Sequence, residues 1–194
     1  MKKGRMEAFS DGVFAIIITI MVLEFKVPTH GHDLNALIPL APFFLSYILS
    51  FVYVGIYWNN HHHMHYLVSS VNGSVSWANL FLLFWLSLLP FGTEWMAANH
   101  FAQVPVAVYG FLLLMCGASY LILARTLATH GGRDSELAQA LGSDWKGKLS
   151  IVIYIIAIIT ARWFPVLACM LYTIVACIWF IPDTRIEKKV LIDN

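Results

Sequence analysis

The sequence predicts an all-α integral membrane protein, on the basis of its composition and its long apolar segments. Of the 194 residues, 59% are hydrophobic and 12% are charged, whereas a soluble globular chain has roughly 45–50% apolar and about 25% charged residues. A helix needs about 20 mostly apolar residues to cross a membrane, and several runs of that length occur. A transmembrane β-barrel would show short alternating segments instead.

Three membrane spans are predicted in the first half of the chain. The first covers residues 8–25 and is closed by Pro28. The second covers 38–58, with prolines in its opening turn, where proline is tolerated, and it continues into a polar extension over 59–65. The third covers 75–96, after an Asn-Gly-Ser turn.

The second half is predicted to contain one single span and a hairpin. Residues 104–124 form the single span, and a long polar segment follows it. One helix over 149–181 would measure about 50 Å, too long for a hydrocarbon core of about 30 Å. We therefore expect two spans there, 145–161 and 164–181, and a single six-span domain over residues 1–194.

The basic residues orient the six spans. With both termini on one side, that side carries ten Lys or Arg residues, and the other carries two, Lys26 and Arg162. Cytoplasmic loops are enriched in Lys and Arg, so we expect a multi-pass plasma-membrane protein with both termini in the cytoplasm. The net charge of +1 and the lack of a basic stretch do not indicate a nucleic-acid partner.

The first helix has a polar beginning and an apolar remainder. Ile16, Ile20 and Leu23 stand at i, i+4 and i+7 on one face, with Thr19 beside them. Asp11 points about 140° away from Ile16, at 100° per residue. Contact with lipid or neighbouring helices is the more common reason for such a face, and a hydrophobic constriction around a pore is the alternative.

Ser10 and Asp11 need partners, because a carboxylate near hydrocarbon is unfavourable unless it is paired or neutralised. The potential partners are Arg5, the histidines of residues 61–65 and the indole N–H of Trp58. We predict a structural polar clamp between helices here. A proton relay through Asp11 is the alternative.

The His-His-His-Met-His segment over 61–65 is the densest group of titratable residues. His61 and His65 have the i, i+4 spacing of two zinc ligands on a helix, but neither a third ligand nor a glutamate accompanies them. We therefore prefer a polar network near Asp11 to a metal site, and we expect no cofactor.

Familiar motifs are missing from the sequence. It has no P-loop, no Gly-rich dinucleotide motif and no Gly-x-Ser-x-Gly, so an enzyme is not expected. It also lacks the Thr-Val-Gly-Tyr-Gly loop of an ordinary potassium-channel filter.

Three segments in the first half of the chain form a recognisable pattern: Arg5-x-x-x-Phe9-Ser10-Asp11-Gly12 with Ala15, Ile16 and Thr19; Trp58-x-Asn60-His61-His62; and Asn79 with Leu89-Pro90-Phe91. This pattern resembles the transmembrane protein 175 family, the endolysosomal potassium channels and their bacterial relatives. A single six-span repeat of this length is similar to the bacterial form.

The resemblance implies a homotetramer in which four copies of the first helix line a pore without a re-entrant filter loop. The constriction of the family falls on Ile16, Ile20 and Leu23, with Thr19 as an added polar layer. The resemblance also implies a structural polar network that braces the first helix against its neighbours, in this sequence at Arg5, Phe9, Ser10, Asp11, Trp58, His61, His62 and Asn79.

We therefore expect a potassium-selective cation channel in which K⁺ is the permeant ion. Apolar rings cannot replace the water around an ion, and potassium holds its water less tightly than sodium, so we expect modest selectivity. One alternative is a proton-coupled transporter of small solutes or cations that uses Asp11 and the 61–65 histidines. A membrane-embedded metalloenzyme built on His61 and His65 is the other.

Overall fold

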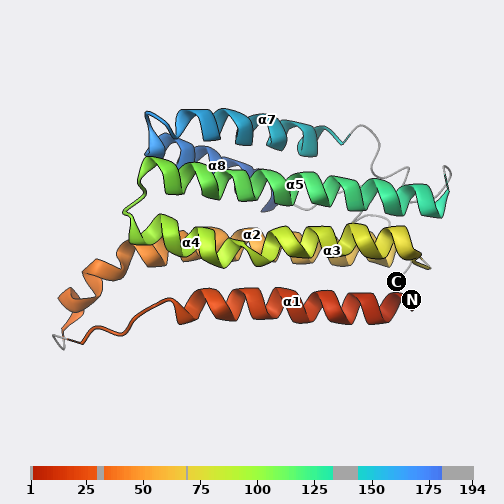
Figure 1. Cartoon of the computed structure of the whole chain (residues 1–194), viewed down its shortest axis with the longest axis horizontal. Helices are drawn as coiled ribbons and strands as arrows, with labels where there is room; N and C mark the ends of the chain where they lie inside the picture. The colour runs from red at the N-terminus through yellow and green to blue at the C-terminus, as the bar shows by residue number, and fades with distance from the viewer. Residues whose placement is uncertain (1, 30–32, 69, 133–143, 181–194) are drawn as a thin grey trace.

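The computed structural model describes residues 2–29, 33–68, 70–132 and 144–180, and all of its regular elements there are helices. The helices run side by side along one long axis, with α1 at one edge of the bundle and α7 at the opposite edge (Figure 1). The predicted all-helical architecture is confirmed over this part of the chain.

The first helix, α1, covers Lys3–Leu23, slightly earlier than the predicted span 8–25. Its buried side chains recur every three or four residues, as expected for a helix with one face against a bundle. They are Met6, Ser10, Phe14, Ile17 and Met21.

A short 3-10 helix, η1 (Leu34–Leu40), leads into the long helix α2 (Ala41–Tyr66). Pro42 lies in the first turn of α2, where its missing N–H interrupts no helical hydrogen bond. The expected polar extension over 59–65 is the last part of this same helix. The histidines therefore project from a continuous helix, close to the start of α1.

The third predicted span consists of two helices, α3 (Gly73–Ser87) and α4 (Leu89–Ala98). Asn72 caps α3 by accepting a hydrogen bond from the backbone N–H of Val75 at 2.9 Å. The break between the two helices falls just before Pro90, because proline cannot supply the next helical N–H.

The remaining helices are α5 (Gln103–Gly131), α7 (Trp145–Thr160) and α8 (Pro165–Phe180). The chain turns between α7 and α8 where the hairpin was predicted, and both helices pack on α5. Gly110 on α5 permits this packing, since a Cβ there would overlap the Tyr172 hydroxyl on α8. The last residue of the predicted span 164–181 lies outside the described residues.

Four helical stretches of the described chain are long and apolar enough to cross a membrane: Lys3–Leu23, Leu34–Tyr66, Gly73–Ala98 and Gln103–Gly131. The helices α7 and α8 have 16 residues each, which corresponds to about 24 Å at 1.5 Å per residue. The six-span count, the cytoplasmic termini and the single-domain boundary stay predictions.

Candidate functional site

Helix α1 has two faces with very different surroundings. We call Ile16, Thr19, Ile20 and Leu23 its open face; Ile16 is 58% exposed and Leu23 is 76% exposed. We call Met6, Ser10, Phe14, Ile17 and Met21 its buried face, where Ile17 is 2% exposed. The spacing of the open face predicted that its members lie together, and the structure shows that the helices of this protomer leave them uncovered.

Thr19 is the polar member of the open face. Its hydroxyl donates to the backbone carbonyl of Ile16 at 2.9 Å. This bond uses the only hydroxyl hydrogen, so the oxygen lone pairs stay available on the open side of the helix. Thr19 therefore keeps an oxygen acceptor among the apolar side chains of the open face.

Three buried side chains join the N-terminal half of α1 to α2 and α3. We call them the inner clamp: His61, Asn79 and Ser10. The Asn79 carbonyl oxygen accepts from His61 Nε2 at 2.7 Å, and the Asn79 amide donates to Ser10 Oγ at 2.9 Å. Ser10 Oγ then donates to the carbonyl of Met6 at 2.9 Å. With the proton of His61 on Nε2, this series of hydrogen bonds runs in one direction, from His61 through Asn79 and Ser10 to the carbonyl of Met6.

Asp11 lies beside the inner clamp but on the exposed side of α1. The indole N–H of Trp58 donates to its carboxylate at 3.0 Å, and the ring of His62 stacks on Trp58 with a centroid distance of 6.5 Å. Asp11 therefore holds α1 to α2 rather than standing alone at the edge of the helix.

The structure does not bring every predicted network residue together within the protomer. Arg5 and Phe9 are both exposed on α1, and their part in the network stays a prediction. His65 Nδ1 donates to the carbonyl of His61 at 2.8 Å, and its Nε2 is buried without a partner in the described part of the chain.

No group of three His, Cys, Asp or Glu residues within the described ranges is placed to hold a metal ion. The rings of His61 and His65 lie with their centroids 4.0 Å apart and their planes tilted by 32°, and each ring already uses one nitrogen in a hydrogen bond. The geometry of the described residues therefore does not support a zinc site at His61 and His65.

A second polar chain, which we call the outer clamp, consists of Tyr109, Ser50 and Thr93. The Ser50 hydroxyl lies 2.9 Å from the Tyr109 hydroxyl and 2.7 Å from that of Thr93. Thr93 in turn donates to the carbonyl of Leu89 at 2.7 Å and lies 3.9 Å from the sulfur of Met21. The outer clamp joins α2, α4 and α5, and through Thr93 it contacts Met21 in the C-terminal half of α1.

Sequence reasoning missed the outer clamp. Its members are isolated hydroxyl residues in three different apolar segments, and nothing in the local sequence indicates that they meet. The only available signal was that a buried hydroxyl in a span must find a partner.

Comparison with known proteins places these features in a family. A family model described as endosomal/lysosomal potassium channel TMEM175 matches residues 5–90, which include α1 from Arg5 onward and both the Ser10 and Asn79 positions. A potassium channel of Chryseobacterium sp. (strain P1-3) is 55% identical over 189 residues, which cover 97% of this chain and 98% of the relative. The chain belongs to the TMEM175 family.

Two further members show how widely the TMEM175 likeness extends. The crystal structure of a lysosomal potassium-selective channel TMEM175 homolog from Chamaesiphon minutus matches with a TM-score of 0.79 and 29% identity, over 93% of this chain and 97% of that one. The human endosomal/lysosomal proton channel TMEM175 is 33% identical over 116 residues, 54% of this chain and 23% of the human protein. The protein is therefore a helical membrane protein of an ion-channel family, and its relatives in that family are not enzymes.

Proposed function

We propose that the protein is a potassium-selective channel of modest selectivity, formed by four copies of the chain around a pore lined by α1. The observation that carries this proposal is the open face of α1, an apolar stripe that the described helices of the chain leave exposed, whereas the buried face of the same helix packs against the bundle. The two matched potassium channels described above support the choice of ion.

Four open faces around one axis would stack the side chains of Ile16, Ile20 and Leu23 into three apolar rings. Such rings offer no oxygen to replace the water of an ion, so they discriminate by the ease of dehydration and by width. The Thr19 oxygens would add a polar ring between the Ile16 and Ile20 levels. Potassium, which loses water more easily than sodium, would pass preferentially.

The structural polar network would keep the open face directed at the axis. The inner clamp and the Trp58–Asp11 bond tie the first half of α1 to α2 and α3, and Arg5, Phe9 and His62 complete the proposed network around them. Both termini would lie in the cytoplasm of a six-span protein of the plasma membrane.

The test is the reversal potential of the reconstituted protein in opposed potassium and sodium gradients. We expect Ile16→Asn to hydrate the constriction, raise the conductance and move the reversal potential toward the non-selective value. Ile122→Asn is the matched control, because Ile122 on α5 is exposed to a similar degree, at 46%. Equal shifts in both variants would refute the pore assignment of α1.

The oligomeric state provides a separate test of the same proposal. Light scattering in detergent should give four times the 21.9 kDa mass of one chain. A monomer in a lipid-like environment would leave the open face without its axis and would contradict the proposed pore.

The proton-coupled transporter is the second candidate, and the name of the human relative, a proton channel, is the observation that favours considering protons. A transporter would give saturating uptake that requires a proton gradient, whereas a channel gives currents that follow the electrochemical gradient of the permeant ion. Currents carried by potassium at equal pH on both sides would exclude obligatory proton coupling.

A further inference from the structure

An open groove of about 260 Å³ lies between α5 and α7, at the end of the bundle where the chain turns from α7 into α8. The wall on α5 is an apolar stripe with the i, i+3, i+4, i+7 spacing of one helix face: Val104, Ala107, Val108 and Phe111. Ile158 on α7 forms the facing wall. Helices α1 and α7 lie at opposite edges of the bundle (Figure 1), so a pore lined by α1 would leave this groove facing the membrane.

Arg162 and Gln103 form the polar end of the groove. Arg162 Nη1 donates to the side-chain oxygen of Gln103 at 3.1 Å, and Arg162 forms no ion pair with any described residue. Most of its N–H donors therefore stay available for another acceptor. Trp163 and Phe164, which follow it, are 64% and 65% exposed, and exposed aromatic residues of membrane proteins gather at the level of the lipid headgroups. We therefore place the charged end of the groove at the level of lipid phosphates.

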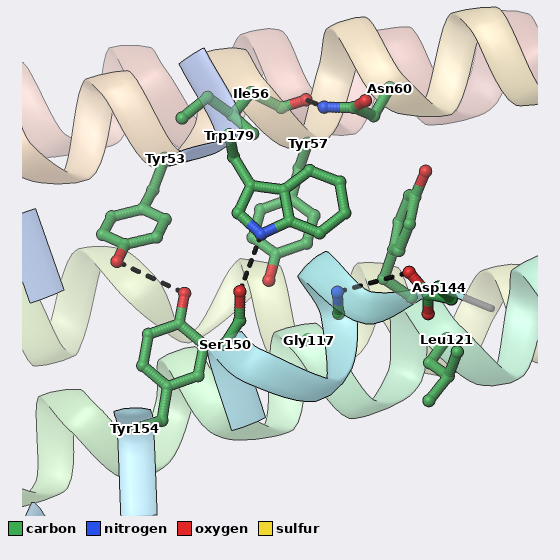
Figure 2. Close-up of a pocket in the computed structure, with 12 residues that line it drawn as sticks. Tyr53, Ile56, Tyr57, Asn60, Gly117, Leu121, Asp144, Ser150, Tyr154 and Trp179 are labelled. Carbon is green, nitrogen blue, oxygen red and sulfur yellow. Dashed lines mark hydrogen bonds between the residues drawn. The ribbon is translucent and has the colours of Figure 1, made fainter. Parts of the chain in front are cut away.

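Helix α7, which forms the second wall, is held closely against the bundle. Its Ser150 hydroxyl accepts from the indole N–H of Trp179 on α8 at 2.8 Å, a bond that Figure 2 shows. Toward the groove, a Cβ added at Gly110 on α5 would lie 3.0 Å from Cγ1 of Ile158. The two walls are thus fixed by contacts within the protomer, and a ligand that enters a preformed groove loses less affinity to ordering.

The groove combines an apolar channel with one basic group at its end. We propose that it binds one anionic phospholipid, with the phosphate at Arg162 and one acyl chain along the apolar stripe of α5. A guanidinium group matches phosphate oxygens with two parallel hydrogen bonds. No carboxylate occurs among the described residues that line the groove, so the ammonium of a zwitterionic headgroup would find no countercharge there.

The length of the groove suits an acyl chain. The stripe from Val104 to Phe111 extends about 10 Å along α5 at 1.5 Å per residue. One leaflet of the hydrocarbon core is about 15 Å thick, half of the whole core. The groove therefore follows most of one acyl chain from the headgroup inward, and both the phosphate and the chain contribute to binding.

Arg162→Gln tests the contribution of the charge. Glutamine keeps a side-chain amide that can donate to Gln103 but carries no charge, and position 162 is exposed in a turn, so the variant is expected to fold. Lys26→Gln is the matched control. Lys26 is also exposed and basic, and it follows α1, which lies at the opposite edge of the bundle.

Val104→Trp tests the contribution of the apolar stripe. Val104 lines the groove and is 62% exposed, so an indole ring at this position takes the space of the acyl chain without entering the core. Val166→Trp on α8 is the matched control, because Val166 is 63% exposed and does not line the groove.

The experiment is native mass spectrometry of the delipidated full-length protein, titrated in detergent with dioleoylphosphatidylglycerol. Three comparison ligands divide this lipid into its parts: dioleoylphosphatidylethanolamine has a zwitterionic headgroup, dioleoylglycerol lacks the phosphate, and glycerol 3-phosphate lacks the chains. We expect saturable binding of one phosphatidylglycerol per chain and weaker binding of each comparison ligand. Arg162→Gln and Val104→Trp should each weaken phosphatidylglycerol binding by about tenfold, and Lys26→Gln and Val166→Trp should leave it unchanged.

The proposal would be overturned if the wild type bound no phosphatidylglycerol, if any comparison ligand bound equally well, or if either Arg162→Gln or Val104→Trp bound phosphatidylglycerol as tightly as the wild type. A second copy of the chain seated in the groove would give the first of these results. Gel filtration and circular dichroism establish that each variant is folded. Because the titration measures binding without any ion flux, its outcome is independent of whether the protein conducts potassium.

Discussion

The two faces of α1 are held by different means. The buried face packs against α2, α3 and α4 and is joined to α2 and α3 by the inner clamp, whereas the side chains of the open face are largely exposed. Ile16 and Ile17 show the contrast best, because they are the same residue type at adjacent positions and are 58% and 2% exposed. The residue type therefore does not tell which isoleucine is packed in the core of the bundle and which is left exposed.

Truncating these two isoleucines should give the largest difference in stability. Ile17→Ala removes packed atoms from the core and should lower the free energy of unfolding by about 2 kcal/mol. This value is near the low end for core truncations, because the unfolded helix stays in lipid, which is as apolar as the core. Ile16→Ala should change the stability of the protomer by less than about 0.5 kcal/mol. Titration with SDS in mixed micelles measures both.

The isoleucine pair also separates stability from conduction. Ile16→Ala should alter ion selectivity while it leaves the unfolding curve unchanged, and Ile17→Ala should do the reverse in any tetramers that still form. If both variants unfolded at the same SDS concentration, the assignment of the two faces would be wrong.

Much of this arrangement could be predicted from the sequence, because it depends on helical periodicity. The spacing of Ile16, Ile20 and Leu23 placed them on one face, and the length of the apolar segments located the helices to within several residues. Periodicity alone leaves open whether an apolar face is covered, since lipid, protein and a pore lumen all accept the same side chains. That distinction depends on how α2, α3 and α4 pack on α1.

Contacts between distant polar residues were harder to predict. Ser10 and Asn79 lie 69 residues apart, and the sequence marked each as polar in an apolar segment without showing that one donates to the other. The outer clamp gave even less signal, because a hydroxyl in a helix can satisfy itself by bonding the carbonyl one turn earlier, as Thr126 does. Only the folded structure distinguishes these two uses of a hydroxyl.

Breaking the inner clamp should give the second-largest effect. Asn79→Leu leaves the His61 N–H and the Ser10 oxygen without their partner, which should cost about 1.5 kcal/mol, close to the upper limit for such bonds in membranes. Asn99→Leu is the control, because Asn99 is exposed and bonds only the carbonyl of Trp95 among described residues. An equal loss in the two variants, measured by SDS titration, would show that the clamp adds nothing specific.

The outer clamp should contribute less to stability. Thr93→Val keeps the shape of the side chain but removes the acceptor of Ser50 and the contact with Met21, and we expect a loss of about 1 kcal/mol. Thr126→Val removes a hydroxyl that bonds only its own helix in the described chain and should be nearly neutral. If Thr93→Val were as stable as the wild type, packing alone would hold the C-terminal half of α1 in place.

Asp11 should give the smallest change in stability and the sharpest distinction between a clamp and a proton relay. Asp11→Asn keeps an oxygen that accepts from the Trp58 indole, so the bond survives without the charge, and an exposed bond of this kind contributes about 0.5 kcal/mol or less. If Asp11 acts only as a clamp, potassium currents should persist in this variant at both neutral and acidic pH. A proton relay needs a group that ionises, and an amide does not, so a complete loss of proton-driven flux in Asp11→Asn with unchanged stability would favour the transporter over the channel.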